Sequence, residues 1–158
     1  MGSEESASLR LRKATPDDAA AIWRLRSTCE VRAVSRRRHA LDPLEFEREI
    51  VASIENPDAE VLVVEVEGRT AGYVRIEPRE PEKFEIGIAL AARWRGRGLG
   101  PRVIAEATRN FLATRPAAAV VALTRPENVA STRAFEAAGY RPAGEAGEFR
   151  VYRADREP

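Results

Sequence analysis

The sequence predicts an α+β domain, built on a mixed, mainly antiparallel sheet of six to seven strands with helices on both faces. Short segments of alternating or continuous apolar residues indicate strands, and longer segments with apolar residues at helical spacing indicate helices. Several strands come first, and a strand–helix–strand–helix–strand order follows. No repeat or low-complexity linker divides the 158 residues. We therefore expect one domain over residues 9–158, after a tail formed by residues 1–8.

The N-terminal part is expected to hold two helices and a series of strands. Thr15 followed by Pro16 places a hydroxyl at an N-cap and a proline at the first helical position, which starts a helix. Asp42 and Pro43 repeat this signal. The expected helices cover residues 15–26 and 42–55, and the expected strands cover residues 9–12, 60–67, 70–76 and 83–90, with a hairpin turn at residues 67–68.

The C-terminal part alternates helices with strands. Apolar residues at helical spacing between Val103 and Phe111 predict one helix, and Asn128 and Gly139 mark the start and the C′ position of the next. Tyr140 follows this cap and is expected in the core. The expected helices cover residues 98–114 and 128–138, and the expected strands cover residues 117–123, 140–143 and 149–154.

Composition excludes several classes of function. The formal net charge is only +1, so the whole surface offers no general attraction to nucleic acid or to a membrane. The single cysteine, Cys29, cannot form an internal disulfide, and with the single histidine, His39, it does not make a metal site. Residues 1–8 lack the features of a signal peptide. We expect a cytoplasmic protein without a metal, and a homodimer is left open.

A glycine-rich segment offers an anion site. Arg95, Arg97, Gly98 and Gly100 follow a predicted strand and open a predicted helix, whose first N–H groups have no partner within the helix. Glycines let the backbone approach a phosphate closely. A dinucleotide fingerprint would need glycine where Pro101 stands, and the ending of a P-loop is absent. A plain turn with solvated arginines is the alternative interpretation.

The pattern Arg95-x-x-Gly98-x-Gly100 resembles the coenzyme A loop of the GNAT acetyltransferases. Residues 127–140 are similar to the family's Asn-x-x-Ser/Ala … Gly-Phe/Tyr segment, with Asn128 at its start. The resemblance implies an N-acetyltransferase that uses acetyl-CoA as cosubstrate. It also implies which residues bind the cofactor: the pantetheine arm at Ile88, Ala89, Leu90 and Asn128, and the pyrophosphate at Arg95, Gly96, Arg97, Gly98, Leu99, Gly100 and Pro101. Asn128 is equally suited to cap the helix.

The resemblance also indicates the catalytic groups. Glu85 lies on the strand beside the expected thioester, where many members carry a glutamate that accepts the proton of the amine, directly or through water. A simple strand-edge carboxylate is the alternative. The tyrosine that usually protonates the leaving thiolate is replaced by Phe135, so Ser131, Tyr152 or a water is expected to act there. A thiolate, with a reference pKa of about 8.5, can also leave unprotonated.

The acceptor is expected to be a primary amine of a small molecule. Residues 26–35 look like a stretch of GNAT enzymes that acetylate nucleotide-linked amino sugars, and the basic residues 36–39 would grip the diphosphate. A solvated basic loop is the alternative for residues 36–39. An amino-sugar nucleotide is thus the favoured acceptor, and a peptide amine or an aminoglycoside is the next. A non-catalytic acyl-CoA-binding module is the rival from another class, because Phe135 replaces the usual tyrosine.

Overall fold

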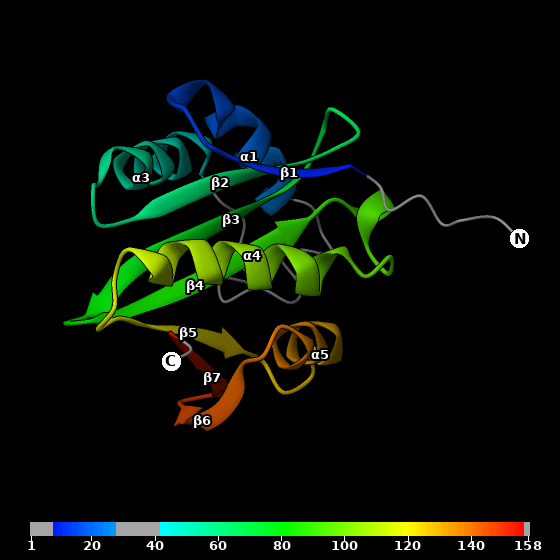
Figure 1. Cartoon of the computed structure of the whole chain (residues 1–158). Coiled ribbons are helices and arrows are strands. Elements are labelled where there is room, and N and C mark those ends of the chain that lie inside the picture. Colours follow the sequence, from blue (N-terminus) through cyan, green and yellow to red (C-terminus); the bar gives the residue numbers. More distant parts are fainter. Residues whose placement is uncertain (1–7, 28–41, 157–158) are drawn as a thin grey trace, which may run out of the picture.

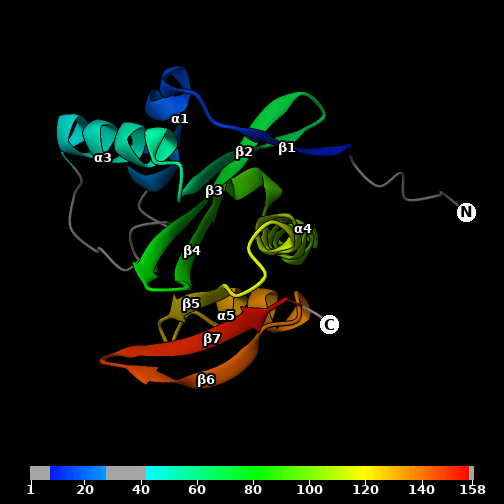
Figure 2. The same cartoon turned by 60° about the vertical axis from the view of Figure 1, so that its left-hand side comes forward.

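A computed structural model describes residues 8–27 and 42–156 of the chain. Within these residues a seven-stranded sheet has the order β1-β2-β3-β4-β5-β7-β6. Neighbouring strands are antiparallel except for β4 and β5, which are parallel. Helices cover both faces of the sheet (Figures 1 and 2). The predicted α+β class, with its mixed, mainly antiparallel sheet, is confirmed.

The elements follow the predicted order. The strands are β1 (Leu9–Lys13), β2 (Glu60–Val66), β3 (Arg69–Glu80), β4 (Lys83–Leu90), β5 (Ala119–Thr124), β6 (Arg141–Ala146) and β7 (Phe149–Asp155). The α-helices are α1 (Ala19–Ser27), α3 (Pro43–Glu55), α4 (Leu99–Ala113) and α5 (Val129–Ala137), and the 3₁₀ turns are η1 (Pro16–Asp18) and η2 (Ala92–Trp94).

Several boundaries differ from the prediction, most clearly at the start of α1 and at the end of β3. The helix expected from Thr15 begins as the 3₁₀ turn η1, in which the Asp18 carboxylate accepts from the Thr15 backbone N–H at 2.8 Å and from the Arg12 guanidinium. Strand β3 continues beyond the expected residue 76 to Glu80, because it stays paired with the beginning of β4. The hairpin between them closes at Glu82, a non-glycine residue with a φ of 62°.

The sheet separates two hydrophobic cores. On one face α4 and α5 pack against strand residues such as Val64, Val74 and Ile86. On the other face α1 and α3 pack against Val63, Tyr73 and other residues of alternate positions. Because side chains alternate along a strand, consecutive residues of β2, β3 and β4 serve opposite cores. The strands therefore carry two independent sets of side chains toward the two layers of helices.

The parallel pair between β4 and β5 is short. It joins Lys83–Glu85 of β4 to Ala119–Val121 of β5, three residue pairs in all, and the two strands separate beyond this point. From Ile86 onward, the edge of β4 that faces β5 has no strand partner in the described part of the chain. The sheet thus opens at its centre, because β4 and β5 both continue beyond the point where their pairing ends.

No helix in residues 8–27 and 42–156 is long and apolar enough to cross a membrane.

Candidate active site

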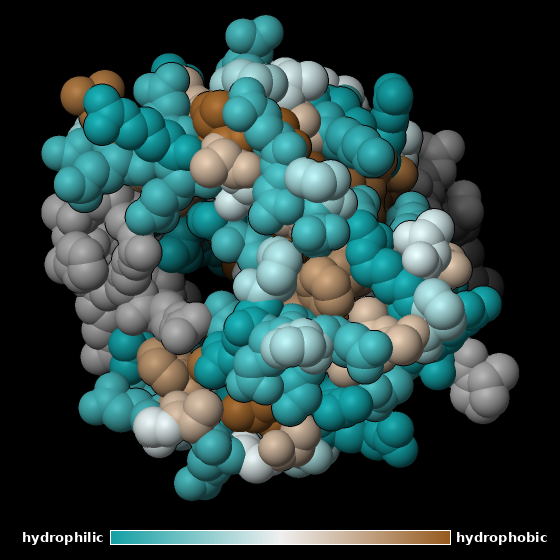
Figure 3. All heavy atoms as spheres, turned by 90° about the vertical axis from the view of Figure 1, so that its left-hand side faces the viewer, coloured by the Kyte–Doolittle hydropathy of each residue, from teal (hydrophilic) through white to brown (hydrophobic). Residues whose placement is uncertain are grey.

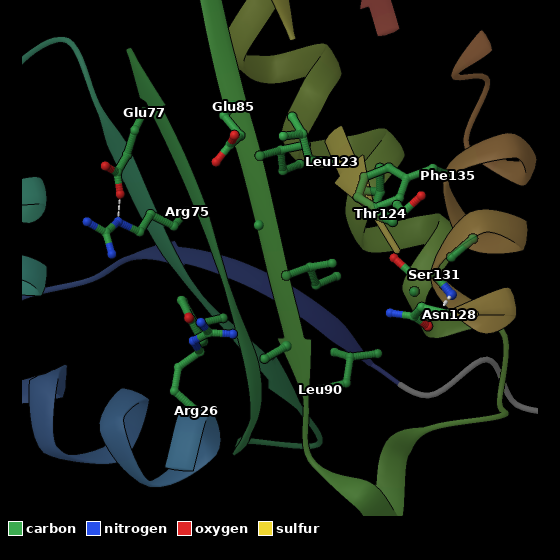
Figure 4. Close-up of a pocket in the computed structure, with 18 of the residues that line it drawn as sticks. Arg26, Arg75, Glu77, Glu85, Leu90, Leu123, Thr124, Asn128, Ser131 and Phe135 are labelled. Atoms are coloured by element: carbon green, nitrogen blue, oxygen red, sulfur yellow. Dashed lines mark hydrogen bonds and ion pairs between the residues drawn. The ribbon is translucent and has the colours of Figure 1, made fainter. Parts of the chain in front are cut away.

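A cavity of about 1100 Å³ lies where β4 and β5 separate. One wall comes from Arg95, α4, β5, α5 and the open edge of β4, and the other comes from α1, α3, β3 and the face of β4 that carries Glu85 and Gly87. Figure 3 shows the molecule hollowed on one side, with hydrophilic side chains around the opening, and Figure 4 shows labelled residues of both walls. Residues from the helices on both faces of the sheet therefore line the cavity. We call the first wall the cofactor wall and the second the acceptor wall, after the ligands expected there from the sequence.

The loop before α4 has the backbone of an anion site. Gly96 and Gly98 have φ values of 71° and 74°, a left-handed conformation that glycine adopts without strain, and Gly98 is the N-cap of α4. The first N–H groups of this 15-residue helix have no partner within it. The Leu99 side chain is buried in the core, so only its backbone faces the loop. Pro101 has no N–H and cannot donate, although it was included in the predicted set.

The two arginines of the loop differ in their contacts. The Arg95 Nε donates to the Leu90 carbonyl at 3.0 Å, which ties the loop to the end of β4, and Arg95 lines the cavity. The Arg97 guanidinium lies over the Trp94 ring, 5.2 Å from its centroid, and is not part of the cavity lining. The two therefore contribute differently: Arg95 organises the mouth of the site, whereas Arg97 adds positive charge from outside it.

Asn128 and Ser131 stand together at the start of α5. The Asn128 Oδ1 accepts from the Ser131 backbone N–H at 3.2 Å, so the predicted N-cap is present. Both residues also line the cofactor wall (Figure 4). Capping uses the oxygen of the Asn128 side chain and leaves its NH₂ group as a donor for a ligand. The capping and ligand-binding interpretations are thus compatible in this geometry.

Glu85 lies on the acceptor wall, across the cavity from Ser131 (Figure 4). Its carboxylate pairs with Arg79, and the neighbouring Glu77 pairs with Arg75. Glu77 and Glu85 are directly opposite each other in the antiparallel β3–β4 ladder, so they occupy the same face of the sheet. The acceptor wall therefore holds two oriented carboxylates, each fixed by a guanidinium from β3.

The three tyrosines of the chain occupy different environments. The Tyr140 hydroxyl is 2.6 Å from the Thr108 hydroxyl inside the core, where burial raises its pKa, as expected for a core tyrosine. The Tyr152 hydroxyl donates to Glu136 at 3.3 Å and lies outside the cavity lining, which speaks against Tyr152 as the proton donor. Tyr73 alone among them lines the cavity. Phe135 is buried beside Tyr140, with ring centroids 5.1 Å apart.

Sequence reasoning missed Tyr73 and Gly87 on the acceptor wall, as well as the ion-paired residues Arg75, Glu77 and Arg79, whereas Arg26 begins the segment expected to bind the acceptor. A glycine within an otherwise apolar strand is a signal of close approach by a ligand, and a Cβ built at Gly87 meets no atom within 4 Å. This signal was available for Gly87. Tyr73 carries no comparable signal, because its role depends on how α1 lies against β3.

This cleft joins a helix N-terminus whose free N–H groups suit an anion to a wall of charged groups held in ion pairs. The family comparison is consistent with it. The model of the acetyltransferase (GNAT) domain matches residues 8–141, and the chain belongs to this family. The predicted acyltransferase activity with acetyl-CoA as cosubstrate is thereby confirmed at the level of the family. No protein with a curated description matches the sequence.

Solved structures share the fold at low identity. The aminoglycoside acetyltransferase AAC(6')-Ib bound to coenzyme A aligns with a TM-score of 0.78 at 17% identity, over 94% of this chain and 95% of that one. A putative phosphinothricin N-acetyltransferase aligns with a TM-score of 0.79 at 21% identity, over 96% and 100%. RimL, a ribosomal L7/L12 alpha-N-protein acetyltransferase bound to coenzyme A, aligns with a TM-score of 0.79 at 18% identity, over 96% of each chain. Their acceptors differ, so the fold does not specify this chain's acceptor.

Proposed function

We propose that this protein transfers an acetyl group from acetyl-CoA to a primary amine of a small molecule, directly and in one ternary complex. The observation that supports this most is the continuity of the cavity, which links the loop before α4 with the charged acceptor wall. Both substrates then meet where β4 has no strand partner on one side in the described chain. Direct transfer needs no protein nucleophile, and this agrees with the types of side chain that line the cavity.

The cofactor wall suits an extended thioester. The N–H groups at the start of α4 would hold the pyrophosphate, and the open edge of β4 at Ile88, Ala89 and Leu90 would bind the amides of the pantetheine arm. The Asn128 NH₂ group would donate to the arm from the other side. Backbone donors fixed in advance stabilise the oxyanion that develops as the amine attacks the thioester carbonyl.

Glu85 is the proposed proton acceptor. An amine must lose a proton before or during attack, and a carboxylate on the acceptor wall can take that proton directly or through a water. As the C–N bond forms and the C–S bond breaks, the sulfur leaves as a thiolate. Ser131, on the opposite wall, is the proposed hydrogen-bond donor to that sulfur, since Phe135 has no proton to give.

Among acceptors, we favour an amino-sugar nucleotide over an aminoglycoside or a peptide amine. The support is the resemblance of residues 26–35 to enzymes of that branch, which lies mostly outside the described residues. Arg26 on the acceptor wall also suits an acceptor with phosphates better than a polycation. Acetylation of a nucleotide-linked amino sugar, compared with an aminoglycoside and a peptide at equal concentration, tests this order.

The substitution Glu85→Gln tests the catalytic role. Turnover with the best acceptor should fall by about 10²- to 10⁴-fold, the usual range for a lost general base. Affinity for coenzyme A should be unchanged, because the residue lies on the acceptor wall. The loss should shrink as the pH approaches the pKa of the amine, since free amine then forms without help. Release of free thiol over a pH series measures the turnover and its pH dependence, and calorimetry of coenzyme A binding measures the affinity.

Two controls accompany Glu85→Gln. Glu80→Gln removes a carboxylate at the rim of the same cavity, one that pairs with Lys83 at 3.6 Å, and should change turnover by less than about threefold. Arg79→Gln removes the ion pair of Glu85 and tests what Arg79 contributes to the orientation and the basicity of this carboxylate. Near-full activity of Glu85→Gln at neutral pH would place the base elsewhere. Binding of acetyl-CoA without thiol release for any amine would favour the non-catalytic module.

A further inference from the structure

The acceptor wall contains one guanidinium that forms no ion pair with any of the described residues. Three cations of β3 and β4 on this side are paired: Arg75 with Glu77, Arg79 with Glu85, and Lys83 with Glu80. Arg26, in the last turn of α1, lines the same wall, and no ion pair joins it to any residue within 8–27 or 42–156. An unpaired guanidinium in a half-buried position is costly unless an anion or water satisfies it.

Tyr73 lies beside this guanidinium. Its side chain is only 5% exposed and packs with Ile22 and Ala89, yet it lines the cavity. Burial raises the pKa of the Tyr73 hydroxyl, and the positive charges of Arg26 and Arg75 counter part of that effect. The hydroxyl therefore stays protonated at neutral pH and can donate. Among the residues that the structure describes, it forms no hydrogen bond.

Both groups lie toward the Leu90 end of β4, away from Glu85. Arg26 points into the cavity near this end, and Glu85 lies near the other (Figure 4). Tyr73 is opposite Ala89 in the β3–β4 ladder, four residues from Glu85 along β4. At about 3.3 Å per residue, these two levels of the strand are about 13 Å apart. The acceptor wall is thus bipolar, with carboxylates at one end and unpaired donors at the other.

We propose that Arg26 and Tyr73 form a binding site for an oxyanion on the acceptor, so that the enzyme selects primary amines that also carry a carboxylate or a phosphate. The guanidinium and the hydroxyl would both donate to the oxyanion, while the amine lies nearer Glu85. This inference rests on the proposed function and specifies its acceptor class. It depends on residues of α1 and β3, and not on the basic residues 36–39.

Paired amines provide the test. Turnover is compared for γ-aminobutyrate, ε-aminohexanoate and phosphoethanolamine against the amides of the first two and ethanolamine. The anionic member of at least one pair should have a kcat/KM about tenfold or more above its neutral partner, the usual range for a charge-assisted hydrogen bond. The carboxylate and phosphate pairs show which oxyanion fits, and the two chain lengths report the reach of the site.

Variants assign the preference to the two residues. Arg26→Gln should remove the preference, Arg26→Lys should restore part of it, and Tyr73→Phe should reduce it by a few fold, mainly through KM. Arg24→Gln, an exposed position on the same helix, is the matched control and should leave the preference unchanged. If neutral amines react as well as their anionic partners, or if Arg26→Gln lowers both equally, the oxyanion site is wrong.

A binding measurement distinguishes failure of this inference from failure of the proposed function. With coenzyme A already bound, calorimetric affinity for the anionic amines is measured in the unmodified protein and in Arg26→Gln. A loss of about tenfold in the variant supports the oxyanion site even if no amine is acetylated, in which case only the proposed function fails. Equal affinity in the two proteins overturns the site even if neutral amines are acetylated. Coenzyme A affinity itself should be the same in both proteins and shows that the variant is folded.

Discussion

The two walls of the cavity bind by different means. The cofactor wall presents mainly backbone groups: the first turn of α4, whose N-cap Gly98 has a φ of 74°, and the unpaired edge of β4. The acceptor wall presents side chains, most of them charged and held in ion pairs such as Arg79 with Glu85. A backbone donor stays in place whatever the neighbouring side chains are, whereas a charged side chain can be exchanged. One wall can thus keep a constant ligand while the other changes its partner.

The largest expected effect comes from disturbing the backbone wall at Gly100. Gly100 is the second residue of α4 and lines the cavity, and a Cβ there would meet the Ala134 Cβ at an ordinary 3.6 Å. Gly100→Glu brings a negative charge to the anion site, and should weaken coenzyme A binding by about 100-fold or more. Gly100→Ala, the matched control, should bind within a few fold. Calorimetry of coenzyme A binding measures both, and equal affinities would contradict the pyrophosphate assignment.

A smaller and more selective effect is expected from Gly87→Val. The Gly87 position faces the acceptor wall, and a Cβ there would meet open space. Valine suits a strand, so the fold should tolerate it, but its methyl groups would occupy the place of the acceptor. We expect kcat/KM for the acceptor to fall by about tenfold to 100-fold, with coenzyme A affinity unchanged. A parallel loss of coenzyme A affinity would show that the two walls are not independent.

The smallest effect concerns the anchor of α1, which carries Arg26. The Arg12 guanidinium donates to both Asp18 oxygens, at 2.9 and 2.8 Å, and chiefly this contact holds the pKa of Asp18 below its usual range. The folded state thus binds fewer protons than the unfolded state at this site. Its stabilisation is complete above the unfolded pKa, about 3.9, and is lost as the pH falls through the lower folded pKa.

Asp18→Asn should therefore lower the free energy of unfolding by about 1 kcal/mol at pH 7 and by almost nothing near pH 2. Asp17→Asn, at the exposed neighbouring position, is the control and should have little effect at either pH. Urea unfolding at the two pH values provides the measurement. An equal loss at both would mean that the charge of Asp18 is not what stabilises η1 and α1.

The contrast between a wall of backbone groups and a wall of side chains also explains which features the sequence could predict. Glycines with left-handed φ values, the helix cap at Asn128 and the Gly139 stop are dictated by local conformation, so the loop before α4 and both ends of α5 were predicted. The boundaries that moved, at η1 and at the far end of β3, depend on contacts with residues distant in the chain or across a hairpin. Local patterns do not contain those contacts.

The acceptor wall was harder to predict. The family resemblance indicates Glu85, but its ion pair with Arg79 depends on the register of β3 against β4. Tyr73 looks like any core residue of an apolar strand, and the sequence shows nothing of its position beside Arg26. The exclusion of Tyr152 likewise needed the position of Glu136. Roles that arise from packing between layers become visible only when the layers are assembled.

The short parallel pair between β4 and β5 has a consequence for solubility. Beyond Glu85 one edge of β4 has no strand partner in the described chain, and the partly exposed apolar residues Ile88 and Leu90 lie along it. Proteins usually protect such edges from pairing with other chains by placing a proline, a lysine or a bulge there. Here that protection would obstruct a thioester bound along β4 as proposed. In that arrangement the ligand shields the edge, so we expect the ligand-free enzyme to aggregate more readily than the complex.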